Sequence, residues 1–262
     1  MFTPVIPSDG LVGWRFLQRT YDTQLSVFNQ SQQVVRSTDY FMEKIGSITT
    51  AEELVSDRRL LEVALGAFGL QDDIDNRFFI KKILEEGTTN DDSLANRFTD
   101  ERYRDLSAAF SLGLGEQSRV GEAGFAEEII SKFQASSFEV AAGSQDSSMR
   151  IALFAQREIP ALAGDDTSND AKWFTIMGQP PLRSVFEKAL NLPSSFGQVD
   201  IDQQLVVFKQ RAREVFGSDD IGQFGSSDAV EDIVTKYIVR SQLDNFSAAT
   251  SSASIALTLL QS

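Results

Sequence analysis

Apolar residues recur every three or four positions along most of the chain, which is the spacing of one face of an α-helix. Across residues 52–68 the apolar positions form one such stripe: Leu54, Leu61, Ala64, Leu65 and Phe68. Threonines at positions 49 and 50, each followed three residues later by a glutamate, can cap this helix, and Gly69 can end it. The apolar-polar alternation of strands is scarce. The pattern predicts an all-α, multi-helical fold.

A second long pattern covers residues 11–45 and has a four-three apolar spacing close to that of a coiled coil. Its apolar positions are Trp14, Leu17, Tyr21, Leu25, Phe28, Val35 and Met42. We expect one long helix here. The pattern lapses at Gln32 and Asp39, which favours a core helix over a seam for a partner. The four candidate partner-binding residues are Trp14, Tyr21, Leu25 and Phe28.

An internal repeat follows this segment. Five apolar residues recur 122 positions later: Leu60, Val63, Ala67, Phe68 and Leu70 match Leu182, Val185, Ala189, Leu190 and Leu192. The stretch AEEIISKF (126–133) matches VEDIVTKY (230–237) 104 positions later. Either the helices are duplicated or similar amphipathic patterns align by chance. Duplication predicts an N-terminal segment 1–45, a first half 46–158, a linker 159–171 with Pro160, Gly164 and a polar cluster, and a second half 172–262.

The last 18 residues, 245–262, contain no charged side chain but several large apolar ones. The candidate contact residues in this tail are Ile255, Leu257, Leu259 and Leu260. One interpretation is a terminal helix folded into its own core. The other is a helix that docks into a partner protein or associates with copies of itself.

Phenylalanine is abundant, with 20 copies against 4 tyrosines and 2 tryptophans. Most phenylalanines are expected in the core, where they add apolar area without a polar group. Neighbours such as Phe78 and Phe79 cannot both face one core from one helix. One of the two should therefore lie at a contact between helices or between molecules.

Composition excludes many kinds of chemistry. The chain of 262 residues contains no cysteine and no histidine, so disulfides, Cys/His zinc sites and catalytic triads with a histidine base are absent. We expect no cofactor and no catalytic residue. A net charge of −14 opposes binding to nucleic acid or to anionic lipid surfaces. No long apolar stretch predicts membrane insertion, and no Sec-type signal is recognised at the N-terminus.

Two motifs resemble ligand sites but fail in detail. Asp165, Asp166, Asn169 and Asp170 crowd oxygen donors, yet the glycine and glutamate of a calcium loop are missing at the required positions. GLGEQS (113–118) begins like a dinucleotide fingerprint, but Ser118 replaces the third glycine and no strand precedes it. We expect a solvated linker and a flexible loop, without a metal or a nucleotide.

The amino-acid sequences of several segments resemble those of one bacterial family, called domain of unknown function 1217. The similar segments are IGSITTAEELVSDRRLLEVALGAFGLQDDID (45–75), KKILEEGTTNDDSLANRFTDERYRDLSAAF (81–110), PPLRSVFEKALNLP (180–193) and VDIDQQLVVFKQR (199–211). The resemblance implies a helical fold and, because such genes often stand beside flagellar genes, a flagellum-associated role. It brings no catalytic residue.

The sequence thus favours a non-catalytic interaction or structural protein with a protein partner, in flagellar assembly or structure. Self-association through the tail fits the same hypothesis. We expect it in the cytoplasm, or exported through the flagellar apparatus without a Sec signal. An enzyme that uses carboxylates or a hard metal, and a small-ligand regulatory module, are the alternatives.

Overall fold

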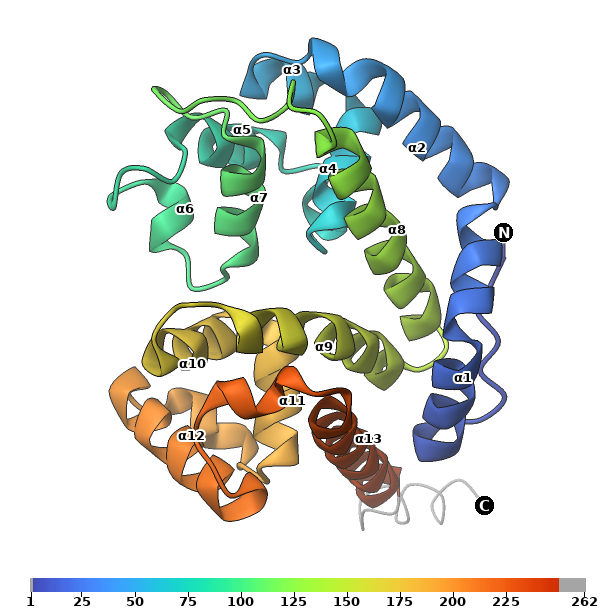
Figure 1. Cartoon of the computed structure of the whole chain (residues 1–262), viewed down its shortest axis with the longest axis vertical. Helices are drawn as coiled ribbons and strands as arrows, with labels where there is room; N and C mark the ends of the chain where they lie inside the picture. Colours follow the sequence, from blue (N-terminus) through green and yellow to red (C-terminus); the bar gives the residue numbers. More distant parts are fainter. Residues whose placement is uncertain (1, 250–262) are drawn as a thin grey trace, which may run out of the picture. The chain divides into compact units, whose positions relative to one another are not determined.

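The computed structural model describes residues 2–249, which form α-helices and short 3-10 helices with no β-strand among them (Figure 1). This confirms the all-α prediction. The α-helices are α1 (Gly10–Asn29), α2 (Gln32–Lys44), α3 (Ala51–Ser56), α4 (Arg58–Ala67), α5 (Arg77–Glu86), α6 (Leu94–Arg97), α7 (Arg102–Phe110), α8 (Phe125–Gly143), α9 (Ser147–Gly164), α10 (Asn169–Gly178), α11 (Pro180–Ala189), α12 (Ile201–Phe216) and α13 (Ser227–Ala249). The 3-10 helices are η1 (Ile45–Ser47), η2 (Gln71–Asp73), η3 (Ser194–Gln198) and η4 (Ile221–Gly225).

The described chain divides into two compact units. Unit 1 contains residues 2–5 and 20–142, and unit 2 contains residues 6–19 and 143–249. This division falls after Ala142, whereas the predicted first half runs to residue 158. The predicted linker 159–171 is largely helical, since α9 continues through Pro160 to Gly164. Ile159 and Ala163 are buried there, and this apolar burial holds the helix together across the proline.

In unit 1, α2 packs on α4, and α3 packs on both α4 and α5. The predicted helix over 52–68 is in fact two helices, because Asp57 leaves the helical conformation and caps α4 through the backbone N–H groups of Arg59 and Leu60. The predicted N-terminal cap is confirmed at Thr50, whose hydroxyl and the Glu53 carboxylate form a reciprocal capping box. Short helices thus turn the chain back on itself inside this unit.

The single helix expected over 11–45 is also two helices. The break lies at residues 30–31, between α1 and α2. It shifts the buried face by one position, so that Val34 and Phe41 are buried on α2, while Val35 and Met42 are exposed. A four-three spacing that runs across a helix break no longer describes one face, which is why the prediction fails in this region.

In unit 2, α9, α11 and α13 pack on one another, and η4 lies against α9 (Figure 1). Aromatic rings fill the core of this unit. The Trp173 ring lies 5.4 Å from that of Phe186 and 5.6 Å from that of Phe208, measured between centroids. The Trp173 indole N–H donates to the carbonyl of Asp219 at 2.9 Å, which ties α10 to the chain between α12 and η4.

The helices α4 and α11, which the proposed repeat makes equivalent, end in the same way. After each helix one residue is left-handed, Gly69 with φ of 70° and Asn191 with φ of 57°. The next residue's N–H then reaches back five positions, from Leu70 to Leu65 at 2.9 Å and from Leu192 to Glu187 at 2.8 Å. This is the Schellman ending. Duplication of the two halves stays a prediction, and the shared ending is consistent with it.

Candidate partner-binding surfaces

The N-terminal candidate residues lie mainly inside the protein. Trp14 is fully buried at 0% exposure, and Phe28 is buried as well. Tyr21 and Leu25 are half-buried, and the rings of Tyr21 and Phe28 meet the edge of the Phe138 ring at 5.4 and 5.6 Å. Trp14 and Phe28 thus pack inside the protein, as the core-helix interpretation expects, while partner binding by this helix stays a prediction.

The tail candidates Ile255, Leu257, Leu259 and Leu260 lie outside the described residues. The helix that leads to them, α13, is described up to Ala249. Its inward face ends at Ser241, which is buried, and every residue from Gln242 to Phe246 is exposed. After Ser241, therefore, α13 continues as a helix whose residues up to Phe246 are exposed.

An exposed apolar row runs along the C-terminal part of α13. It consists of Val239, Leu243 and Phe246, which we call the α13 stripe. Their exposed fractions rise toward the chain end, at 37%, 59% and 68%. Residues spaced by four and three positions lie on one helix face, so the stripe is continuous. An exposed apolar row of this kind is typical of a contact surface.

The charged residues beside the stripe are bound within unit 2. The Asp244 carboxylate pairs with the Lys188 ammonium at 3.0 Å. The Arg240 guanidinium donates to the side-chain carbonyl of Asn191. Both partners lie at the end of α11, which therefore receives the charged side of α13. The stripe itself carries no charge.

A second exposed apolar side chain lies on α5. Phe78 is 82% exposed, whereas its neighbour Phe79 packs edge-on against Phe98 and Tyr103 at 5.2 and 5.3 Å. One of the pair thus lies outside the core, while the expected contact at Phe78 stays a prediction. The Tyr103 hydroxyl donates to the Asp73 carboxylate at 2.7 Å. Burial first, and then this hydrogen bond, raise the pKa of Tyr103 to about 12.

The loop with the GLGEQS motif closes on unit 1 through Glu116. This carboxylate accepts the backbone N–H groups of Thr88 and Thr89 at 2.7 and 3.2 Å, and the Thr89 hydroxyl at 2.9 Å. Burial opposes its ionisation, yet these hydrogen bonds lower the pKa of Glu116 below its ordinary value. The glycines let the backbone pass close to Gly87. The motif thus serves as an internal clasp, by which we mean the hydrogen bonds that join Glu116 to Thr88 and Thr89. Leu114, in the same loop, is 97% exposed.

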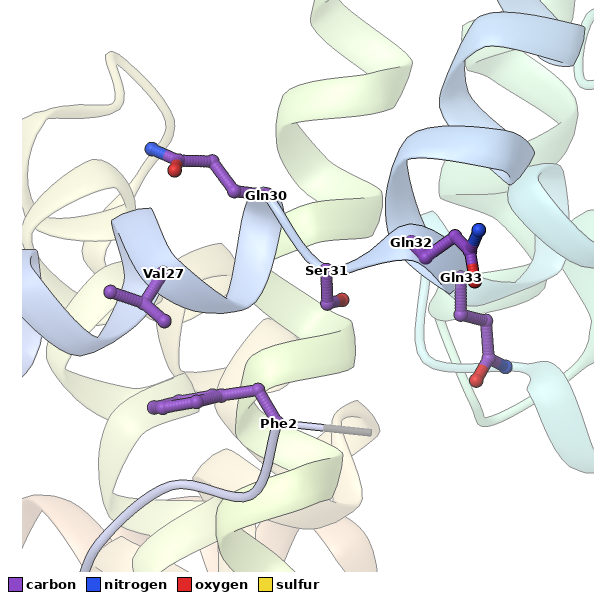
Figure 2. A pocket seen from close by; sticks show the side chains of 6 residues that line it. All are labelled: Phe2, Val27, Gln30, Ser31, Gln32 and Gln33. Carbon is purple, nitrogen blue, oxygen red and sulfur yellow. The ribbon is translucent and has the colours of Figure 1, made fainter.

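A surface pocket of about 680 Å³ lies in unit 1 where α1 gives way to α2. Its lining residues are Phe2, Val27, Gln30, Ser31, Gln32 and Gln33 (Figure 2). The Phe2 ring lies below Val27, while the Gln30 side chain extends away from it (Figure 2). The Gln24 side-chain amide holds the nearby N-terminal segment: it accepts a hydrogen bond from the Val5 backbone N–H at 2.6 Å and donates one to the Val5 carbonyl at 3.2 Å. Sequence patterns gave no signal for this pocket, because it depends on residue 2 folding back onto α1.

Two of the four oxygen-donor residues of the predicted linker, Asn169 and Asp170, bind other parts of unit 2. Asn169 binds the backbone of Asp219 and Ile221, and Asp170 pairs with Lys209 at 2.6 Å. Across residues 2–249, no three acidic side chains are grouped so that they could hold a metal ion. In the same described part of the chain, no helix is long and apolar enough to span a membrane.

The fold defines the chain as an all-α protein of two helical units. The family model described as "Protein of unknown function (DUF1217)" matches residues 67–230, and the chain belongs to this family. The crystal structure of protein AGR_C_984 from Agrobacterium tumefaciens is similar in fold, with a TM-score of 0.74 and 22% identity over 93% of this chain and 99% of that one. No curated protein matches the sequence.

Proposed function

We propose that this protein is a non-catalytic helical contact protein that works in flagellar assembly or structure. It binds a protein partner through the α13 stripe and the uncharged residues 245–262, which overlap at Phe246. It acts in the cytoplasm or after export through the flagellar apparatus. Its negative charge of −14 disfavours a nucleic-acid partner.

The observation that carries the proposal is the exposed end of α13. Isolated helices are marginal in water because most helical stability in proteins comes from packing of an apolar face. Beyond Ser241, each of the five residues from Gln242 to Phe246 is exposed. Covering the Leu243 side chain by a partner would contribute about 1.5–3 kcal/mol. The exposed Leu243 side chain therefore makes this helix end suited to binding.

The flagellar setting comes from the resemblance to the family, because genes of that family often stand beside flagellar genes. The absence of cysteine is consistent with it. The setting and the contact surface are separate parts of the proposal, and the experiment below addresses both.

The experiment compares Leu243→Asp with Val206→Asp in co-sedimentation with hook, basal-body and filament preparations from motile cells. Val206 is a matched control, because it is also an exposed apolar residue of unit 2, at 64% exposure on α12. We expect Leu243→Asp to reduce binding by about tenfold or more, the effect of losing about 1.4 kcal/mol. Val206→Asp should bind like the unchanged protein.

Equal binding by both variants would contradict the stripe as the contact surface. Failure of the unchanged protein to sediment with any flagellar fraction would contradict the flagellar setting. Thermal unfolding of both variants serves as a control, since an exposed substitution should change stability by no more than about 0.5 kcal/mol.

A further inference from the structure

We propose that the outer side of α5 is a further docking surface, which binds a protein segment with apolar side chains next to a cluster of lysines or arginines. Its two apolar anchors are Phe78, which is 82% exposed, and Leu114, which is 97% exposed. We call these two side chains, with the surface of α5 between them, the α5 face. All of it belongs to unit 1, whereas the α13 stripe belongs to unit 2, so this proposal is separate from the proposed function.

The two anchors lie at opposite ends of α5. Phe78 and Glu85 are seven residues apart, which is two helical turns, so they share one side of the helix about 10 Å apart. The Leu114 backbone N–H donates to the Glu85 carbonyl at 3.1 Å, and this bond joins the loop of Leu114 to the end of the helix. The opposite side of α5 faces the core through the buried residues Ile80, Ile83 and Leu84.

Leu114 is held in place although its side chain is exposed. Its own N–H is bound to Glu85, and two residues later the clasp joins Glu116 to Thr88 and Thr89. A side chain on a fixed backbone loses less conformational freedom when a partner covers it than one on a loose loop. Covering its apolar surface would then add to affinity. The clasp therefore presents Leu114 in a form suited to binding.

The Leu114 end of the α5 face is acidic. Residues 81–92 contain four carboxylates and two lysines, and the Glu116 carboxylate adds a fifth negative charge. Both lysines are already paired, Lys81 with Glu52 at 2.5 Å and Lys82 with Glu86 at 3.6 Å. A surplus of carboxylates thus remains at this end.

Asp91 and Asp92 make this surplus available to a partner. Both are exposed, and neither forms an ion pair with a lysine or arginine within residues 2–249. They follow Thr89, which is bound to Glu116, so they lie in the loop that is joined to that of Leu114. At the other end of the face, Arg77 is exposed next to Phe78. Charge complementarity therefore favours a segment whose basic residues lie beside the apolar residue that covers Leu114.

Two synthetic peptides test the α5 face on the full-length chain. Both are amphipathic helices with leucines along one side; the first has a cluster of lysines at one end, and the second has glutamates in their place. Fluorescence anisotropy of the labelled peptides measures binding. We expect the lysine peptide to bind, and the glutamate peptide to bind at least about tenfold more weakly, a difference of about 1.4 kcal/mol.

Substitutions in the protein locate the binding. Leu114→Ser and Phe78→Ser should each weaken binding of the lysine peptide by about tenfold. Val206→Ser is the matched control, because Val206 is an exposed apolar residue of unit 2, and it should bind like the unchanged protein. The double variant Asp91→Asn, Asp92→Asn should bind about threefold or more weakly at low salt and lose less affinity as salt rises. All of these exposed substitutions should leave the melting temperature nearly unchanged.

Three results would overturn the proposal: no binding of the lysine peptide by the unchanged chain, equal binding of the two peptides, or a loss for Val206→Ser as large as that for Leu114→Ser. Binding that Leu243→Ser abolishes and Leu114→Ser leaves intact would place the peptide on the α13 stripe. That result overturns the α5 face alone and leaves the proposed function standing.

Discussion

The Glu116 carboxylate accepts the backbone N–H of Thr88 at 2.7 Å, although the two residues are 28 positions apart. The same oxygen also receives the N–H and hydroxyl of Thr89. These groups lie just past Gly87, where α5 ends. One side chain therefore fixes both the end of α5 and the long loop before α8.

Replacing Glu116 with Gln should destabilise the protein by about 2 kcal/mol, because hydrogen bonds to a charged group contribute about 1.5–3 kcal/mol. The pKa of Glu116 is lowered by folding, so the carboxylate's contribution is present above its ordinary pKa and is lost as pH falls below it. Urea unfolding at pH 7 should show the full difference from the unchanged protein, and at pH 3–4 a smaller one. An equal change for Glu62→Gln, an exposed residue of α4, would contradict the clasp.

Gly66 should be sensitive to a single added methyl group. A Cβ there would lie 2.7 Å from Cδ2 of Phe133 on α8, which is too close for undistorted packing. Overpacking of about 1–3 kcal/mol should outweigh the helix preference of alanine, about 1 kcal/mol. We expect Gly66→Ala to lower the melting temperature. Gly164→Ala on α9, where a Cβ meets nothing within 4 Å, is the control and should leave it unchanged or raise it.

The shared ending of α4 and α11 gives a test of their equivalence. Gly69 is left-handed, and a Cβ there would lie at an ordinary 3.6 Å from Arg102, so only backbone strain opposes substitution. Gly69→Ala should destabilise by about 1 kcal/mol. Gly69→Asn should be milder, because asparagine tolerates this conformation and occupies it at Asn191. Denaturant unfolding in which the asparagine variant is the less stable one would contradict this.

Tyr103 should ionise late in an alkaline titration. Its pKa is raised to about 12, so between pH 9 and 10.5 the phenolate absorbance of Tyr103→Phe should match that of the unchanged protein. The raised pKa also means that the hydroxyl's stabilisation is complete below pH 10 and is lost as pH rises through about 12. At pH 7, Tyr103→Phe should lose about 1 kcal/mol, the usual contribution of such a hydrogen bond. A drop in absorbance below pH 10.5 would mean an ordinary phenol.

Local signals in the sequence were informative where short-range physics decides the structure. The capping box of Thr50 and Glu53 and the stop at Gly69 are examples, since each depends on neighbours in the chain. The sequence could not show that Asp57 interrupts the apolar stripe, because a capping carboxylate in mid-pattern looks like an ordinary exposed residue. The phase shift between Phe28 and Val34 was hidden for the same reason.

The candidate surfaces differ in the same way: some follow from neighbours in the sequence, and others depend on contacts between distant residues. Burial of Trp14 and Phe28 is set by what packs over α1, and periodicity alone does not distinguish a core face from a partner face. Phe78 could be foreseen, since adjacent aromatic residues cannot share one helix face. The roles of Glu116 and of the pocket around Phe2 depend on contacts between residues far apart in sequence. The exposure of the α13 stripe likewise depends on where burial of the helix ends, at Ser241, and the sequence pattern does not show that position.

The most direct measurement is made on a chain shortened to residues 1–244, which keeps the pairing of Lys188 with Asp244. If the end of α13 is a contact surface, the shortened chain should melt within about 3 °C of the full chain, as expected for a change of under about 1 kcal/mol, while partner binding and self-association are lost. A fall of about 8 °C or more, with binding retained, would contradict the account, because residues 245–262 would then belong to the core.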